Sequence, residues 1–395
     1  MTFLITFFCS QLLIVLGTIL KIISNKMMIY FLRFSYASFL IFSGSIKLID
    51  PIGFSYKLQE YFEVFGMDFL VPLSLILSIT VILFEICLGI FLIYGFQTKK
   101  VMWGNLLLMI FFTFLTFFSA YFNKVTDCGC FGDFLKLDPW HSFIKDIHLL
   151  FVSLVLFLNQ DKINPLLSSL LKIKDDNFYL SKKLLLVKFS FFLLFSIYTI
   201  SHLPIIDFRP YKIHSDLISG KKLPENAKKD VYEDIWFYEI DGKVSEYTTE
   251  EAPWSIEGAV YKDRITKLVS KGDEPLIKDF DIVDPTQDLN ITDSLLNLER
   301  VALIISFDIK KAKSKSHKKI LKYIKSLSST NLPIYGLSSS SKSEIDSQTS
   351  LLANSIPWFL VDQTTLKTII RSNPGVIILE KGVVVNKWHW RDLPI

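Results

Sequence analysis

The sequence predicts two parts of different fold class: an all-α polytopic membrane bundle, followed by an α/β domain outside the membrane. Half of the 395 residues are hydrophobic and 35 are Phe, and the mean hydropathy of +0.38 is too high for a single soluble domain. Most apolar residues precede residue 205 and form runs long enough to cross a bilayer. After residue 298, short β-prone and helical segments alternate, which is typical of α/β domains.

Charge and cysteine content exclude two classes of protein. The formal net charge is +4, and no basic cluster is interleaved with aromatic residues, so nucleic acid is not an expected partner. Four cysteines in this length do not make the disulfide framework of a small secreted domain. The lipid bilayer is the partner that the composition predicts.

Six apolar runs predict six transmembrane helices. They are residues 3–20, 27–48, 71–94, 101–122, 143–158 and 184–200. Nothing basic precedes the first run and no small-residue cleavage site follows it. We therefore interpret residues 1–26 as an extra transmembrane helix, rather than a signal peptide or the product of an early start codon. Residues 27–160 then form a four-helix membrane domain, and residues 161–204 form a lysine-rich cytoplasmic connection with the last transmembrane helix.

Residues 53–68, between the second and third runs, alternate aromatic and charged side chains. This pattern favours an amphipathic helix that lies along the membrane interface.

Lysine and arginine collect at one set of helix ends. These residues are Lys21, Lys26, Arg33, Lys99, Lys100, Lys162, Lys172, Lys174, Lys182 and Lys183. If the helices alternate in direction, all of them face one side, which the positive-inside rule identifies as the cytoplasm. We therefore expect a multi-pass protein of the bacterial inner membrane. Residues 53–68, the loop between the fourth and fifth runs (residues 123–142) and everything after residue 203 are expected on the extracytoplasmic side.

Cys128 and Cys130 lie one residue apart in the loop before the fifth run. A disulfide across the single Gly129 is strained and hence oxidising, whereas Asp127 and Asp133 oppose ionisation of the thiols. The alternatives are two reduced structural thiols or a metal site. Nearby histidines are not spaced like paired ligands, so no metal is predicted.

Glu85 lies in the middle of the third run, where a carboxylate is costly unless it is paired or protonated. Its candidate partners are Lys47, Lys145 and Arg33. Lys145 and Asp146 begin the fifth run, where they either snorkel to the surface or cap the cysteine loop. The alternative for Glu85 is a protonated, hydrogen-bonded side chain that fixes helix packing.

Residues 205–297 are expected to be an extracytoplasmic linker region with one hairpin. Its strands, 236–240 and 244–248, are joined by Asp241-Gly242, which suits a tight turn. From residue 301 the predicted order is β-α-β-α-β-α-β-β. The segments are 301–307, 316–327, 333–337, 343–354, 358–361, 364–370, 376–379 and 383–387, and Pro374 precedes the penultimate strand.

This order, with its proline, resembles the thioredoxin fold. There the corresponding proline is cis and lines the active-site cleft, which implies a partner-binding role for the region of Pro374. Redox-active thioredoxins carry Cys-x-x-Cys after the first central strand. Here residues 307–312 read FDIKKA, and no cysteine follows Cys130. Residues 298–395 are thus expected to be a thioredoxin-like domain without active-site cysteines.

The membrane part resembles the DoxX/MauE group of four-helix membrane proteins, in particular bacterial members with a thioredoxin-like tail. The resemblance rests on residues 42–47, on Glu85 with Leu88-Gly89, on the loop DCGCFGD at 127–133 and on FIKD at 143–146. MauE-type proteins are associated with maturation of methylamine dehydrogenase, whose small subunit is rich in disulfides. DoxX-type proteins are linked to membrane-bound oxidoreductases and to redox or sulfur stress.

The expected function is a thiol–disulfide or electron relay in envelope protein maturation, which would make the chain a component of a membrane thiol–disulfide oxidoreductase. Cys128 and Cys130 form the redox pair, and Glu85, Lys145 and Asp146 support it. The expected electron acceptor is a partner thiol or a quinone, and the expected partner is an envelope protein or a thioredoxin-like redox protein. The alternatives are a non-catalytic scaffold whose tail binds an envelope partner, and a small-molecule carrier that uses Glu85.

Overall fold

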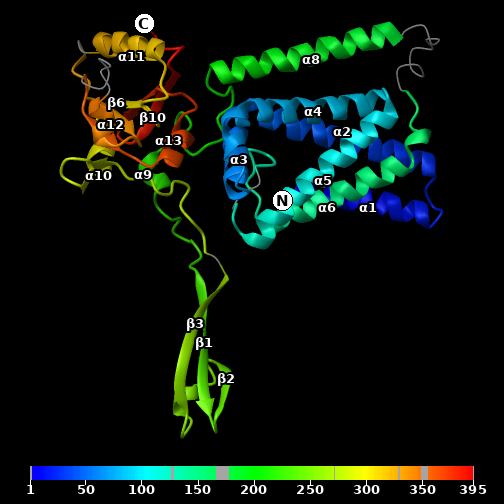
Figure 1. Cartoon of the computed structure of the whole chain (residues 1–395), viewed down its shortest axis with the longest axis horizontal. Helices are drawn as coiled ribbons and strands as arrows, with labels where there is room; N and C mark the ends of the chain where they lie inside the picture. The colour runs from blue at the N-terminus through cyan, green and yellow to red at the C-terminus, as the bar shows by residue number, and fades with distance from the viewer. Residues whose placement is uncertain are drawn as a thin grey trace. The chain divides into compact units, whose positions relative to one another are not determined.

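The computed structural model describes residues 2–125, 129–165, 178–270, 272–327, 330–347 and 355–394. The chain divides into two compact units, Met1–Arg209 and Pro210–Ile395, which are coloured from blue to green and from green to red in Figure 1.

The first unit is helical. Its elements are α1 (Thr2–Ile19), α2 (Asn25–Ile49), α3 (Pro51–Val64), the 3-10 helix η1 (Asp68–Leu73), α4 (Ser74–Tyr94), α5 (Thr98–Phe122), α6 (Pro139–Leu158), the 3-10 helix η2 (Gln160–Lys162) and α8 (Phe178–Ser201).

Within the described residues, four helices are long and apolar enough to cross a membrane. They are Asn25–Ile49, Asp68–Tyr94, Thr98–Phe122 and Pro139–Leu158, at the positions of the second to fifth predicted spans. The first and sixth predicted spans also form helices, but their described apolar stretches, Leu4–Ile19 and Leu186–Ser201, are shorter.

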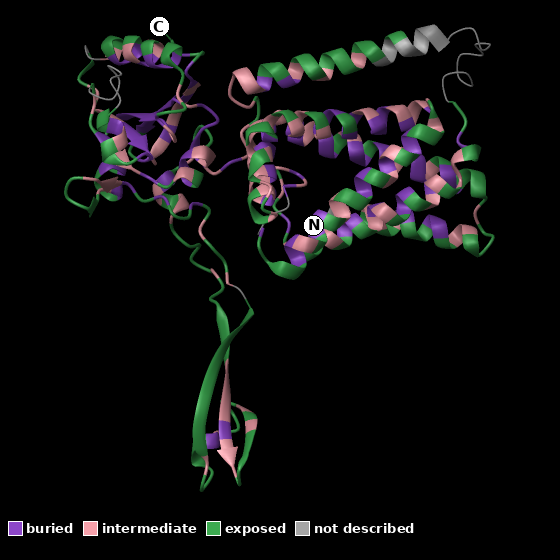
Figure 2. Cartoon of the chain, in the orientation of Figure 1, coloured by how far each residue is buried: buried purple, intermediate pink, exposed green. Residues whose placement is uncertain are grey.

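Large apolar side chains on the outside of the bundle are exposed. On α5 these include Trp103, Leu107 and Phe114, whereas buried residues follow the helix faces that meet inside (Figure 2). An apolar exterior around a packed interior suits a bundle surrounded by lipid.

Helices α2 and α4 approach each other closely at two glycines. A Cβ on Gly44 would lie 2.5 Å from Cγ1 of Ile86, and one on Gly89 would lie 2.9 Å from the backbone oxygen of Ala37. Small residues at such crossings let helix backbones come together inside a membrane. This close contact brings the charged side chains of α2 and α4 within reach of each other.

Helix α3 packs against the bundle, at the position of the predicted interface helix. Asp50 caps its first turn by accepting a hydrogen bond from the backbone N–H of Gly53 at 2.9 Å. Its buried residues include Phe54 and Leu58, and the hydroxyl of Tyr61 is 2.7 Å from that of Ser119 on α5. The placement of α3 at a membrane interface stays a prediction.

The second unit contains two sheets. Its elements are α9 (Leu217–Gly220), β1 (Val231–Ile240), β2 (Lys243–Thr248), the 3-10 helix η4 (Pro253–Ser255), β3 (Val260–Ser270), β4 (Val283–Asp284), β5 (Leu289–Asn290), α10 (Thr292–Leu296), β6 (Val301–Ile305), α11 (Ser314–Leu327), β7 (Ile334–Ser338), α12 (Lys342–Ser347), β8 (Trp358–Leu360), α13 (Gln363–Ile369), β9 (Gly375–Glu380) and β10 (Val383–His389).

The smaller sheet has the order β2-β1-β3. The predicted hairpin is confirmed, since β1 and β2 pair antiparallel up to Ile240 and Lys243. Asp241 and Gly242 supply the positive φ angles that the turn needs. The sequence pattern did not predict β3, which pairs along the other side of β1.

The larger sheet has the order β10-β9-β6-β7-β8-β4-β5. Strand β6 runs parallel to β7 and antiparallel to β9, and every residue of β6 is buried. The predicted order of elements from residue 301 is found. Helix α12 is described only to Ser347, and residues 348–354 of the helix predicted there lie outside the described residues.

Part of the predicted linker region completes this sheet. Strand β4 pairs with β8, and Phe280 and Ile282 just before it are buried. The ring of Tyr211 packs edge-to-face against that of Phe280. The backbone oxygen of Tyr211 accepts a hydrogen bond from Nζ of Lys387. Residues 210–297 therefore contribute to the core of the second unit as well as carrying the hairpin.

Candidate functional site

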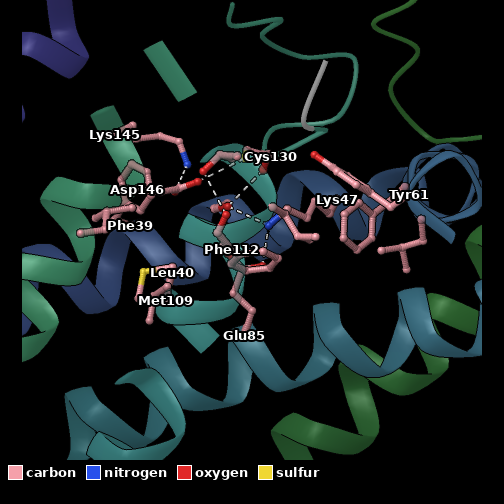
Figure 3. A pocket seen from close by; sticks show the side chains of 16 residues that line it. Phe39, Leu40, Lys47, Tyr61, Glu85, Met109, Phe112, Cys130, Lys145 and Asp146 are labelled. Carbon is pink, nitrogen blue, oxygen red and sulfur yellow. Dashed lines mark hydrogen bonds and ion pairs between the residues drawn. The ribbon is translucent and has the colours of Figure 1, made fainter. Parts of the chain in front are cut away.

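A small pocket that contains charged side chains lies inside the helical bundle, next to the cysteine loop (Figure 3). Its polar lining residues are Ser43, Lys47, Tyr61, Glu85, Thr116, Cys130, Lys145 and Asp146, and the rest of the lining is apolar. The cavity measures about 20 Å³, enough for on the order of one water molecule. The side chains that line the pocket therefore interact mainly with one another.

Lys47 of α2 and Glu85 of α4 form a buried ion pair. Nζ of Lys47 lies 2.6 Å from Oε2 of Glu85, and the two residues are 3% and 2% exposed. The same Nζ donates a hydrogen bond to Oγ of Ser43 at 3.1 Å and lies 5.1 Å from the ring centre of Phe112. A buried charge needs such partners, since one left alone in an apolar interior is costly.

The partner of Glu85 is thus Lys47, one of the three predicted candidates. Arg33 instead donates hydrogen bonds of 2.8 Å to the backbone oxygens of Leu92 and Ile93 at the end of α4, and to that of Asn164. These are the carbonyl groups that a helix end leaves without partners, so Arg33 caps a helix rather than joining the pocket.

Lys145 and Asp146, adjacent on α6, form the second buried ion pair. They are 6% and 1% exposed, and Nζ of Lys145 lies 5.6 Å from the ring centre of Phe131. The alternative that Lys145 snorkels to the surface is wrong, because its charged end points into the pocket. With two lysines and two carboxylates, the described pocket is balanced in formal charge.

The cysteine loop is bound to the bundle through Cys130. Its Sγ lies 4.0 Å from Oδ2 of Asp146, and Oγ of Ser43 donates a 3.3 Å hydrogen bond to its backbone oxygen. Gly129 has a φ of +66°, and a Cβ there would lie 2.9 Å from Cγ of Lys57. Glycine therefore allows the loop to turn tightly against α3.

Cys128 and Asp127 lie outside the described residues, so the pairing of Cys128 with Cys130 stays a prediction. Neither His141 nor His148 is a lining residue of the pocket. His141 pairs with Asp138, and Nε2 of His148 is 2.7 Å from Oε1 of Gln11. Within the described part of the chain, no group of three or more His, Cys, Asp or Glu side chains has the arrangement of a metal site.

Ser43, Tyr61 and Thr116 are polar pocket residues to which the sequence assigned no role of their own, and Ser43 is the one that contacts the cysteine loop. It connects the Lys47–Glu85 pair with the backbone of the cysteine loop. The spacing of Ser43 and Lys47, four residues apart on one helix, is a signal that they share a face.

Pro374 in the second unit follows a cis peptide bond with Asn373. Asn373 donates a 2.7 Å hydrogen bond from Nδ2 to the backbone oxygen of Asp308 and accepts one at Oδ1 from Ser306. The proline thus adjoins the segment after β6, where the predicted thioredoxin-like fold would place active-site cysteines. Partner binding at Pro374 stays a prediction.

Comparison with known proteins identifies the segment that holds the pocket. Residues 25–159 match the family model described as methylamine utilisation protein MauE, which covers about a third of the chain. None of the curated proteins and none of the solved structures compared with the chain matches it. The matched residues contain the four span-length helices, both ion pairs and Cys130. The chain is therefore a multi-pass membrane protein whose residues 25–159 form a domain of the DoxX/MauE-like family.

Proposed function

We propose that the protein is a thiol–disulfide relay of the bacterial inner membrane, in which Cys128 and Cys130 exchange electrons with an envelope protein. The observation that supports this most directly is the position of Cys130. Its sulfur lies 4.0 Å from the carboxylate of a buried ion pair, inside the domain that matches the family. Charged groups beside a thiol change how readily it ionises and reacts.

The proposed reaction is a two-electron exchange. When the loop is oxidised, two S–H bonds break and one S–S bond forms between the cysteines, releasing two electrons and two protons. A disulfide in the partner takes them up and becomes two thiols, or a quinone takes them up and becomes a quinol. The reverse exchange reduces the loop.

The tail is proposed to bind the partner without reacting itself. The strand order around β6 supports a thioredoxin-like fold, while no cysteine follows Cys130 in the sequence. The distribution of lysine and arginine supports an extracytoplasmic position for both the loop and the tail. The family description further suggests a role in a methylamine utilisation-like system.

The test is the redox state of Cys128 and Cys130 in intact membranes, measured by alkylation with a mass tag before and after mild reductant. We expect a tag shift that reverses when a membrane oxidant such as a quinone is added. Variants Cys128→Ser and Cys130→Ser should abolish the shift, whereas Cys9→Ser and Cys87→Ser are matched controls that should keep it. Thiols that stay reduced and accessible in the presence of oxidant would favour the scaffold function instead.

A further inference from the structure

We propose that Asp146 and Lys145 control the reactivity of Cys130 in opposite directions. Asp146 holds the proton on sulfur at rest and accepts it when the sulfur reacts, and Lys145 then neutralises the thiolate. This inference rests on the proposed thiol–disulfide function and assigns each charged neighbour a separate role in it.

The geometry places an acceptor and a cation together beside the thiol. Sγ of Cys130 donates to Oδ2 of Asp146 at 4.0 Å, while the other carboxylate oxygen, Oδ1, is paired with Nζ of Lys145. In Figure 3 the side chains of Lys145 and Asp146 lie on the same side of the pocket as Cys130. A base must be within hydrogen-bond reach of the proton that it removes, and Asp146 meets this condition for a sulfur donor.

The other helices around the pocket contribute a second ion pair, whose two charges cancel. Lys47 of α2 and Glu85 of α4 neutralise each other at 2.6 Å, α3 contributes the phenol of Tyr61, and the pocket residues from α5 are not titratable. Lys57 of α3, near Gly129, is paired with Glu60. Asp133, in the same loop as Cys130, is paired with Lys136 at 4.0 Å. In the described surroundings of Cys130, the ion pair of Lys145 and Asp146 is the one that contacts its sulfur.

Proton transfer within this group keeps the charge of the pocket unchanged. If the thiol lost its proton to bulk water, the pocket would gain a negative charge in mostly apolar surroundings, which is costly. If Asp146 takes the proton, the negative charge moves from oxygen to sulfur and Lys145 still compensates it. The S–H bond breaks and an O–H bond forms, so that a neutral carboxylic acid and a lysine–thiolate pair result.

The thiolate can then attack a disulfide of the partner. A new S–S bond forms between Cys130 and one partner sulfur, and the old partner disulfide breaks. The departing partner sulfur carries the electron pair and takes up a proton, which Asp146 can return. Before the partner arrives, the ionised Asp146 disfavours a second negative charge beside it, so the thiol remains protonated and poorly reactive.

The test measures the alkylation rate of Cys130 against pH with iodoacetamide, in full-length protein carrying Cys9→Ser, Cys87→Ser and Cys128→Ser. The alkylation rate reports the population of thiolate, which the negative charge of Asp146 lowers, rather than the transfer of the proton to Asp146. We expect Asp146→Asn to raise the rate at pH 7 by about tenfold or more and Lys145→Met to lower it by about tenfold or more. The pH of half-maximal rate should move down in the first variant and up in the second. The alkylation rate of the double variant, Asp146→Asn with Lys145→Met, should lie between the rates of the two single variants.

Asp138→Asn is the matched control, because Asp138 is an exposed carboxylate that precedes the same helix α6, and it should leave the rate profile unchanged. Asp146→Glu keeps the charge and should stay near the parent profile, which separates an electrostatic effect from a folding defect. Equal rates in both single variants, or shifts in the same direction, would overturn the inference. The readout does not require electron relay, so a failure of this inference can be distinguished from a failure of the proposed function.

Discussion

At the scale of single residues, the bundle depends on charges that satisfy one another inside an apolar interior. Lys47 and Glu85 are nearly inaccessible to solvent and in direct contact. Forming such a pair stabilises a protein little, since desolvation offsets the attraction, but removing one partner leaves an uncompensated buried charge. The pair therefore favours the helix arrangement that keeps both residues together.

Glu85→Gln is expected to destabilise the bundle by about 3–5 kcal/mol, because Lys47 loses its counter-charge. The measurement is the free energy of unfolding in detergent, followed by circular dichroism. Lys99→Met removes an exposed ion pair with Asp161 and should change stability by less than about 1 kcal/mol. Equal losses of unfolding free energy in Glu85→Gln and Lys99→Met would contradict the expectation that a buried ion pair is more costly to break than an exposed one. The double variant Lys47→Met with Glu85→Gln should recover most of the loss.

His317 gives the second unit a pH-dependent stability. The side chain is 7% exposed and its Nε2 has no hydrogen-bond partner in the described structure, and burial lowers the pKa of His317. The unfolded chain therefore binds a proton more readily than the folded unit. The free energy of unfolding of this unit is therefore highest above the ordinary histidine pKa of about 6.5, and it decreases as the pH falls through that value.

Denaturant midpoints of the full chain, followed by tryptophan fluorescence at pH 7.5 and pH 5, test this expectation. His317→Leu should reduce the difference between the two pH values, since it removes the titrating group while keeping an apolar side chain. His214→Leu is the comparison, because His214 is exposed in the folded unit, and the pH difference should persist in this variant. An unchanged difference in His317→Leu would assign the effect to other groups.

At the scale of elements, the crossing of α2 and α4 decides whether the pocket forms. Gly44 and Gly89 allow the contact, and Lys47 and Glu85 lie on the faces that meet there. The cysteine loop then attaches to α2 through Ser43 and to α6 through Asp146. Loss of the crossing should therefore affect the loop as well as the ion pair.

Gly89→Ala is expected to destabilise the bundle by about 1–3 kcal/mol, because the added methyl group meets the backbone of Ala37 and forces the helices apart. Gly104→Ala is the matched control, since the atoms nearest to its new methyl group are side-chain atoms of Leu88 and Phe84, which can move. The control should be neutral or slightly stabilising, as alanine favours helix. Unfolding measurements on both variants distinguish close backbone contact from a general intolerance of alanine.

At the scale of the whole molecule, the proposed relay requires the cysteine loop and the tail on one side of the membrane. The positive-inside rule predicts that side to be extracytoplasmic. The prediction concerns membrane topology, and it can be tested residue by residue in the complete chain.

Single cysteines introduced by Lys136→Cys in the loop and Lys243→Cys in the hairpin should react with a membrane-impermeant maleimide in intact spheroplasts. Lys99→Cys, in the first turn of α5, should react only after the membrane is opened. Protein without any cysteine gives the background level of maleimide labelling. Labelling of Lys99→Cys in closed spheroplasts, without labelling at the other two sites, would show that the topology is the opposite of the predicted one.

Much of the element order could be predicted because it depends on local patterns. Long apolar runs mark the four central helices, Asp241-Gly242 marks the hairpin turn, and alternating short segments mark the strands and helices after residue 301. Strand β3 and the pairing of β4 with the larger sheet could not be predicted, because their partners are distant in sequence and their own patterns are weak.

The sequence by itself determined that this protein has an apolar helical part with Glu85, Lys145, Asp146 and the cysteines as its unusual residues. Residue type and apolar surroundings are sufficient for that, since a charge within an apolar run is costly wherever the run folds. Only the tertiary structure decided that Glu85 pairs with Lys47, that Arg33 caps a helix, and that Asp146 faces Cys130. Several lysines and carboxylates satisfy the same local rules, and the crossing of α2 with α4 and the packing of the loop on α6 select among them.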